Sequence, residues 1–187
     1  MKPAIGAALL LLPASVGAQM LPECALPRTK LEAMAVLEGA VVVRGSARIG
    51  AVRGEAGALL FVAAKEFSNA ASGERAQGIA VELRLPDHPK PQRPCYVDLE
   101  EIPGLLAGLE HLSAVERSAT SLDEFEADYR TKGGLLATVF SAAGAPRAAV
   151  ACGFGPASTE LEISDFLRFR QLLQSAFERL KSSGAAR

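Results

Sequence analysis

The chain has 187 residues, and its 20 lysines and arginines nearly balance 21 aspartates and glutamates. This balance, with an isoelectric point near 6.2, argues against a nucleic-acid-binding protein, which normally carries a basic excess. Hydrophobic residues make up 49% of the chain, so it can bury a core, and its length suits a single domain. Because there are only two histidines and three cysteines, we expect no metal site and no cofactor.

The first eighteen residues have the three-part layout of a secretory signal peptide. Lys2 gives a positive start, residues 4–12 are apolar, and Pro13 breaks this stretch before Val16-Gly17-Ala18. We predict a signal peptide at 1–18, cleaved before Gln19, and a single β-rich domain at 19–187. Because the apolar stretch is too short to cross a bilayer, we expect an exported protein, periplasmic or secreted, with no transmembrane segment after cleavage.

The three cysteines, Cys24, Cys95 and Cys152, would enter an oxidising compartment after export. An odd number allows one internal disulfide and leaves one thiol over. Cys152 ends an apolar run at 148–152, so we expect it to be a buried free thiol. If the chain has a disulfide, we predict it between Cys24 and Cys95, which both lie in proline-flanked stretches.

Residues 41–99 follow mainly the period of β-strands. Strands are predicted at 41–43, 47–52, 58–67, 79–85 and 95–99. In the fourth of these, Glu82 and Arg84 alternate with apolar residues, which indicates one solvated face and hence an antiparallel sheet. The segment 86–94 is rich in proline and is predicted to be a loop.

The second half of the chain begins with helical spacing at 101–115 and then returns to strands at 125–131, 135–140, 147–152 and 160–163. A final helix is predicted at 164–182. Its apolar residues form one stripe that should cover the core, namely Phe166, Phe169, Leu173, Ala176, Phe177 and Leu180.

This order of elements predicts an α+β fold, with a curved antiparallel β-sheet or a partly open barrel. One helix is inserted between two groups of strands, and the C-terminal helix caps the core. The order resembles that of a pleckstrin-homology-like (PH-like) barrel, in which four strands, three strands and a helix follow one another. Such a likeness of element order implies nothing about function.

A charged strip is expected on the predicted strand at 125–131, where Glu126, Asp128 and Arg130 share one face and Lys132 follows in the turn. These four residues are our candidates for binding a polar ligand or a partner. The alternative is a solvated strand face with cross-strand ion pairs, each worth ~0.2–1 kcal/mol. A calcium site on the stretch Asp123-Glu124-x-Glu126-x-Asp128 is disfavoured because it lacks the glycine turn and the distal glutamate of an EF-hand loop.

The same segment, Phe125-Glu-Ala-Asp-Tyr-Arg-Thr-Lys-Gly133, resembles a motif F-E-A-x-Y-R-T-K-G of a family of uncharacterised exported bacterial proteins. The stretch Tyr96-Val-Asp-Leu-Glu-Glu-Ile102 and the helix start Ser164-Asp165-Phe166 add to this resemblance. It implies secretion and a single domain, and it implies no activity.

No motif for catalysis is present. A G-x-S-x-G elbow is absent, His88 lies in the proline-rich loop, and His111 lies on the polar flank of a predicted helix. We therefore expect a small, exported, non-enzymatic domain, namely a periplasmic binding or interaction module whose partner is an envelope protein or a small ligand. Two alternatives stay open: a hydrolase or small-ligand carrier with a loop-built site, and a cell-envelope assembly subunit.

Overall fold

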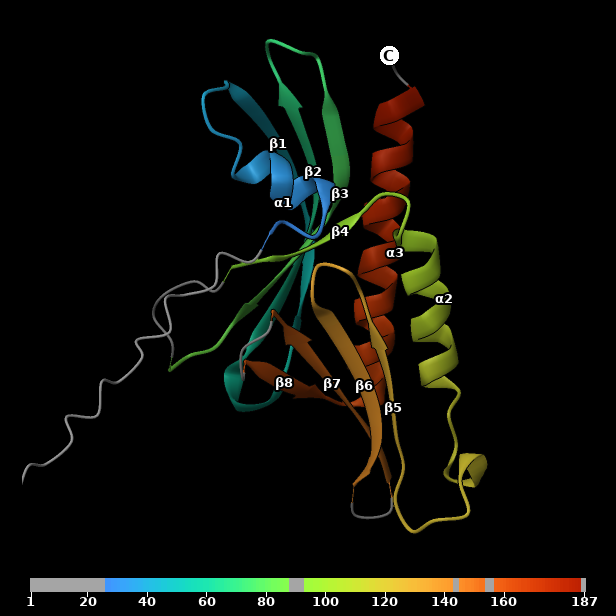
Figure 1. Cartoon of the computed structure of the whole chain (residues 1–187). Coiled ribbons are helices and arrows are strands. Elements are labelled where there is room, and N and C mark those ends of the chain that lie inside the picture. Colours follow the sequence, from blue (N-terminus) through green and yellow to red (C-terminus); the bar gives the residue numbers. More distant parts are fainter. Residues whose placement is uncertain (1–25, 88–92, 143–144, 154–156, 186–187) are drawn as a thin grey trace, which may run out of the picture.

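The computed structural model describes residues 26–87, 93–142, 145–153 and 157–185. They form an α+β fold with two antiparallel four-stranded sheets, which do not close into a barrel (Figure 1). The predicted signal peptide at 1–18, its cleavage site and Cys24 lie outside the described residues. Within the described ranges, no helix is long and apolar enough to cross a membrane.

The first sheet, sheet A, has its strands in chain order, β1-β2-β3-β4. They are β1 (Val42–Arg53), β2 (Leu59–Asn69), β3 (Arg75–Arg84) and β4 (Cys95–Asp98). The two strands predicted at 41–43 and 47–52 are one continuous strand, because Gly45 and Ser46 stay extended opposite Glu66 and Lys65. A shift of register between Arg48 and Gly50 leaves a β-bulge in β1.

The second sheet, sheet B, is also a meander, with the order β5-β6-β7-β8. Its strands are β5 (Glu126–Arg130), β6 (Leu135–Ala142), β7 (Ala145–Cys152) and β8 (Ser158–Leu161). All four were predicted within a few residues. Because the second group has four strands and not three, the predicted PH-like order is not confirmed.

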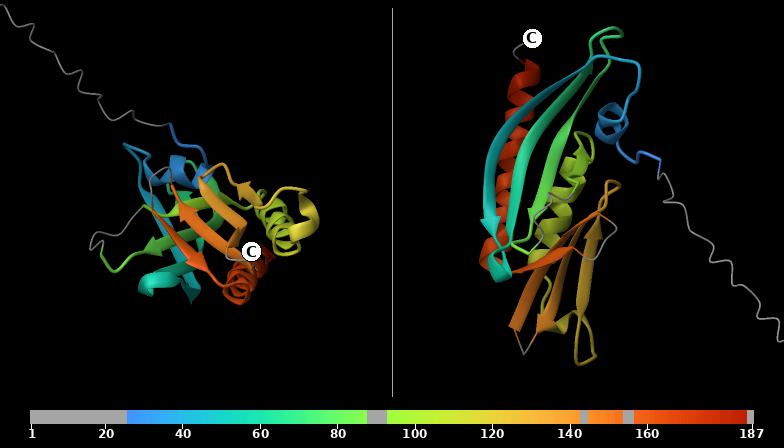
Figure 2. Two further views of the ribbon diagram at one scale, coloured as in Figure 1. Left: turned by 90° about the horizontal axis from the view of Figure 1, so that it is seen from below. Right: turned by 90° about the vertical axis from the view of Figure 1, so that its left-hand side faces the viewer.

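Two helices cover the apolar faces of the sheets, and both were predicted. They are α2 (Ile102–Ser113) and α3 (Ile163–Ala185). The long α3 runs along one face of sheet A, and α2 packs between α3 and the strands β5 and β6 (Figure 2). The predicted stripe of α3 is buried with one exception: Phe177 is half-buried, and the Lys181 ammonium lies 4.1 Å from its ring centre.

A short helix that we did not predict, α1 (Lys30–Ala35), lies on the opposite face of sheet A. Thr29 and Glu32 form a capping box at its start, and the Asp98 carboxylate accepts from the backbone N–H groups of Lys30 and Leu31 at 2.9 and 3.2 Å. It forms a small second core with a few residues of the sheet, among them Leu31, Met34, Phe67 and Ala76. Because α1 has only six residues, it covers only the part of this face around Phe67 and Ala76.

Candidate functional site

The charged strip predicted from the sequence lies on β5, an edge strand of sheet B. Glu126, Asp128 and Arg130 are exposed on one face, and Lys132 follows in the turn, where its backbone N–H donates to Glu101 Oε1 at 2.8 Å. The strand opposite offers Phe140, Thr138 and Leu136 as their neighbours, so the expected cross-strand ion pairs do not form among the described residues. A binding role for these four residues stays a prediction.

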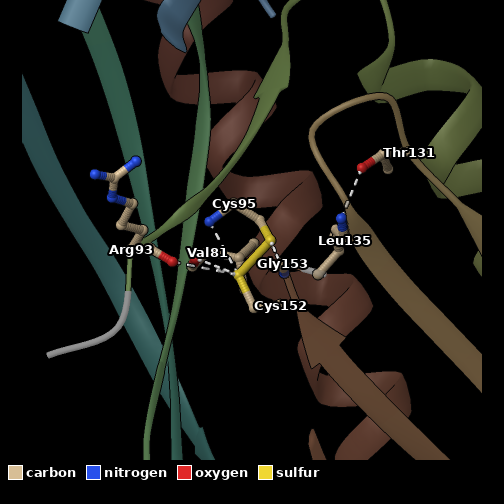
Figure 3. Close-up of a disulfide and its surroundings, with 7 residues drawn as sticks. All are labelled: Val81, Arg93, Cys95, Thr131, Leu135, Cys152 and Gly153. Atoms are coloured by element: carbon tan, nitrogen blue, oxygen red, sulfur yellow. Dashed lines mark hydrogen bonds between the residues drawn. A yellow bond between two sulfur atoms is a disulfide. The ribbon is translucent and has the colours of Figure 1, made fainter. Parts of the chain in front are cut away.

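Our predicted cysteine pairing is wrong, because Cys95 forms its disulfide with Cys152 (Figure 3). Cys95 begins β4 and Cys152 ends β7, and the packing of the two sheets brings their Cα atoms to 5.6 Å, a usual distance for a disulfide. Cys152 is therefore buried as predicted, with 4% of its surface exposed, but it is not a free thiol. The bridge ties sheet A to sheet B.

A cavity of about 470 Å³ lies beside this disulfide. Its wall is mainly apolar and includes Leu26, Val36, Pro94, Tyr96 and both cysteines. The charged groups at its wall come from Arg28, Glu32 and Arg93, and the Glu32 carboxylate accepts from the Arg28 and Thr29 backbone N–H groups. The cavity can therefore hold a small molecule with an apolar body.

The outer face of sheet A, the face away from α3, carries a cluster of basic side chains around one aromatic ring. We call it the basic face, and it comprises Arg44, Arg48, Phe61, Lys65 and Arg84, from three adjacent strands. A hollow of about 140 Å³ lies over most of it and reaches Tyr96, which also lines the larger cavity. Among the outward positions of β1, β2 and β3, the one acidic side chain is Glu82.

Aromatic rings hold most of these cations in place. The Arg48 and Arg84 guanidinium carbons lie 5.9 and 4.5 Å from the centre of the Phe61 ring, and that of Arg44 lies 5.8 Å from the ring of Phe67. Such contacts are worth ~0.5–1 kcal/mol at exposed sites. They order the guanidinium groups without neutralising them, so the basic face keeps its positive charge.

Three polar contacts complete this arrangement. Arg44 Nη2 donates to the Ala35 carbonyl of α1 at 3.0 Å. Lys65 Nζ donates to Ser46 Oγ at 2.8 Å, and Arg84 Nε donates to Glu82 Oε1 at 2.8 Å. The Glu82 carboxylate raises the pKa of Arg84, by its hydrogen bond first and by its charge second. One carboxylate therefore faces four cations on this surface, which leaves a positive excess.

Tyr96 joins the basic face to the cavity, and its hydroxyl is held in the neutral form. Burial raises the pKa of Tyr96, while the nearby charge of Arg44 acts in the opposite direction. The ring also meets that of Phe67 edge to face, with 6.0 Å between their centres. Tyr96 can therefore offer a neutral hydroxyl and an aromatic edge at physiological pH.

The described residues offer no cluster of three or more His, Cys, Asp or Glu side chains that could hold a metal ion. His111 lies exposed in the last turn of α2, and His88 falls outside the described residues. These findings leave the basic face and the neighbouring cavity as the surfaces best suited to binding.

Sequence reasoning missed the basic face, although part of its signal was present. The alternation of β3 placed Arg84 on a solvated face, and the spacing Arg44-x-Ser46-x-Arg48 has the same period. The register of β1 against β2 was needed to show that these residues share a face with Phe61. No protein-family model, no curated protein and no solved structure matches the chain.

Proposed function

We propose that the protein is an exported interaction module that binds an acidic partner protein on the basic face of sheet A. The observation that carries this proposal is the excess of ordered cations on the outer face of sheet A. Complementary charge steers a partner and fixes its orientation. A protein partner is favoured over a nucleic acid because the chain as a whole carries a net charge of −1.

Export is part of the same proposal. It is supported by the signal-peptide pattern of residues 1–18 and by the disulfide between Cys95 and Cys152, because disulfides persist in oxidising compartments. The resemblance of residues 125–133 to exported bacterial proteins points the same way. Fractionation of cells that express the chain with and without residues 1–18 tests it, and equal retention of both forms in the cytoplasm would overturn it.

Charge reversal on the basic face is the direct test of partner binding. Immobilised poly-L-glutamate serves as the acidic probe, and the double variant Arg48→Glu/Arg84→Glu is compared with wild-type protein. We expect at least about tenfold weaker binding, which corresponds to ~1.4 kcal/mol. The matched control is Arg168→Glu/Arg179→Glu, which reverses two exposed charges on α3.

The outcomes separate the proposal from its rivals. Equal losses in both double variants would show a general effect of net charge and would overturn the proposal. Tighter binding to duplex DNA or to anionic vesicles than to poly-L-glutamate would also overturn it, in favour of a nucleic acid or a membrane. Thermal unfolding of each variant shows whether the fold is intact.

The cavity beside the disulfide supports a second candidate function, the carriage of a small ligand. Its apolar wall, with Arg28 and Arg93 at the margin, suits an amphiphilic anion. Anilinonaphthalene sulfonate is a suitable fluorescent probe, and Val36→Trp should exclude it by filling the cavity. Unchanged fluorescence in Val36→Trp would contradict a carrier role for this cavity.

A further inference from the structure

Strand β1 lies at one edge of sheet A, and no described strand pairs with its outer edge. In the order β1-β2-β3-β4, β1 pairs with β2 alone among the described residues. It is twelve residues long and is the outermost strand in the right-hand view of Figure 2. The run from Val43 to Ser46 is exposed, as is Arg48. Such an edge presents a row of unpaired backbone N–H and C=O groups.

The hydrogen bonds of the ladder show which residues face this free edge. The Ala70 N–H donates to the Val41 carbonyl at 2.9 Å, one step beyond the pair Val42 and Asn69. Antiparallel residue pairs alternate between hydrogen-bonded and non-hydrogen-bonded pairs, so the backbone groups of residues 43, 45 and 47 form hydrogen bonds with β2. The backbone groups of Arg44, Ser46 and Arg48 therefore point away from β2, toward the free edge.

The same three residues carry their side chains on the outer face of the sheet. Arg44 and Arg48 belong to the basic face, and Ser46 lies between them, bonded to Lys65. On the other face of β1, Val43 is 57% exposed and Ala47 is partly buried against the core. The edge thus offers backbone groups, two cations on one side and apolar surface on the other.

We infer that this edge takes an extended, acidic segment of a partner protein as a fifth strand of sheet A. The inference rests on the proposed binding of an acidic partner and adds how that partner is held. Every second residue of the partner segment is acidic. These acidic residues lie directly opposite Arg44, Ser46 and Arg48 and exchange backbone hydrogen bonds with them. The residues between them are apolar and lie beside Val43 and Ala47. Such a partner makes the protein a subunit of an assembly.

A second copy of the chain does not fit this edge. An antiparallel pair of β1 strands centred on Ser46 would set Arg44 of each chain opposite Arg48 of the other. Like charges directly opposite each other destabilise a strand pair. The arginines therefore protect the edge from self-association and favour an acidic strand.

The test uses the full chain and a capped synthetic peptide of alternating Glu and Val. Ser46→Pro removes the N–H at the centre of the free edge, and proline is tolerated on an edge strand when its missing donor faces solvent. The matched control, Ser46→Ala, also loses the hydroxyl contact with Lys65 but keeps the N–H. We expect Ser46→Pro to bind the peptide at least about tenfold more weakly than Ser46→Ala does, because the two variants differ in the N–H and share the loss of the hydroxyl.

Modified peptides give a second measurement that needs no change in the protein. Methylation of the Glu backbone nitrogens removes the donors that would face β1 and should abolish binding. The same change at the Val nitrogens blocks the outer edge of the added strand and should leave binding intact. Equal effects of the two modifications would overturn strand addition.

The two proposals fail separately. If Ser46→Pro binds as tightly as wild type while Arg48→Glu/Arg84→Glu does not bind, the basic face binds its partner without strand addition. If neither variant weakens binding, both proposals are overturned. If the protein dimerises and Ser46→Pro abolishes the dimer, the occupant of the edge is a second copy.

Discussion

The outer faces of the two sheets differ in where their basic groups find partners. On sheet B, Arg147 forms ion pairs with Glu55, Glu160 and Glu162. On sheet A, Arg44 and Arg48 lie over aromatic rings, and Lys65 bonds to a hydroxyl. The same strand alternation therefore gives an arginine neutralised within the molecule on one sheet and a positive excess on the other.

The difference distinguishes a charge that stabilises the fold, which we call structural, from a charge that can bind a partner, which we call available. Glu55 belongs to the short 3-10 helix Glu55–Gly57 between β1 and β2, so its ion pair with Arg147 joins sheet A to sheet B. Arg147 is only 22% exposed, whereas Arg44 and Arg48 are exposed. We conclude that Arg147 stabilises the packing of the sheets and that the basic face, where Glu82 pairs with Arg84 alone, keeps an excess of positive charge for a ligand.

The largest effect is expected from the disulfide, which joins the two sheets covalently. Its cysteines are 57 residues apart, and the loss of a native disulfide that closes a loop of this size costs ~2–5 kcal/mol. We expect Cys95→Ala/Cys152→Ala to lower the free energy of unfolding in urea by this amount. Cys24→Ala is the control for the pairing of Cys24 with Cys95 that we predicted from the sequence. If Cys24→Ala lowers the free energy of unfolding as much as the double variant does, that first pairing would be supported instead.

The second prediction compares Arg147→Met with Arg48→Met. The first leaves three carboxylates without their shared cation, so we expect a clear fall in Tm that shrinks in high salt. The second removes an exposed cation and its contact with the Phe61 ring, and it should change stability by no more than ~1 kcal/mol. Equal changes in Tm would remove the distinction between a structural and an available charge.

Most of the fold could be predicted from the sequence because its signals are local. The stripe of α3 and the alternation of β3 and β5 each lie within one element, and each was confirmed. The helix α1 was missed although its capping box, Thr29-x-x-Glu32, was visible. A helix of six residues is too short to show periodicity, so the capping pattern was the only signal.

The candidate site was harder to predict because it depends on contacts between distant segments. Cys95 and Cys152 meet only through the packing of two sheets, and spacing carries no information on that packing. Phe61 and Arg84 become neighbours through the register of β2 against β3. By contrast, the strip on β5 was visible because Glu126, Asp128 and Arg130 belong to one strand.

The smallest effect expected is on the ionisation of the two tyrosines of the chain, one in each sheet. Burial raises the pKa of Tyr96, and the charge of Arg44 lowers it. Burial also raises the pKa of Tyr129, and there the charge of Glu101 raises it further. Both hydroxyls are therefore neutral in the folded chain up to a higher pH than in the unfolded chain. Their contribution to stability is complete below pH ~10 and is lost as the pH rises through the folded values.

Arg44→Gln separates the two tyrosines. Removing the cation should raise the pKa of Tyr96 further and leave that of Tyr129 unchanged, because Arg44 belongs to the outer face of sheet A alone. Ultraviolet titration of tyrosinate in the Tyr96→Phe and Tyr129→Phe backgrounds reads each group in turn. A shift of Tyr129, or a fall in the pKa of Tyr96, would show that the charge of Arg44 does not act locally on the basic face. A rise in pKa confined to Tyr96 would show that the charge of Arg44 acts on the hydroxyl that lies between the basic face and the cavity. Such a result would support a positive excess that belongs to the outer face of sheet A and not to sheet B.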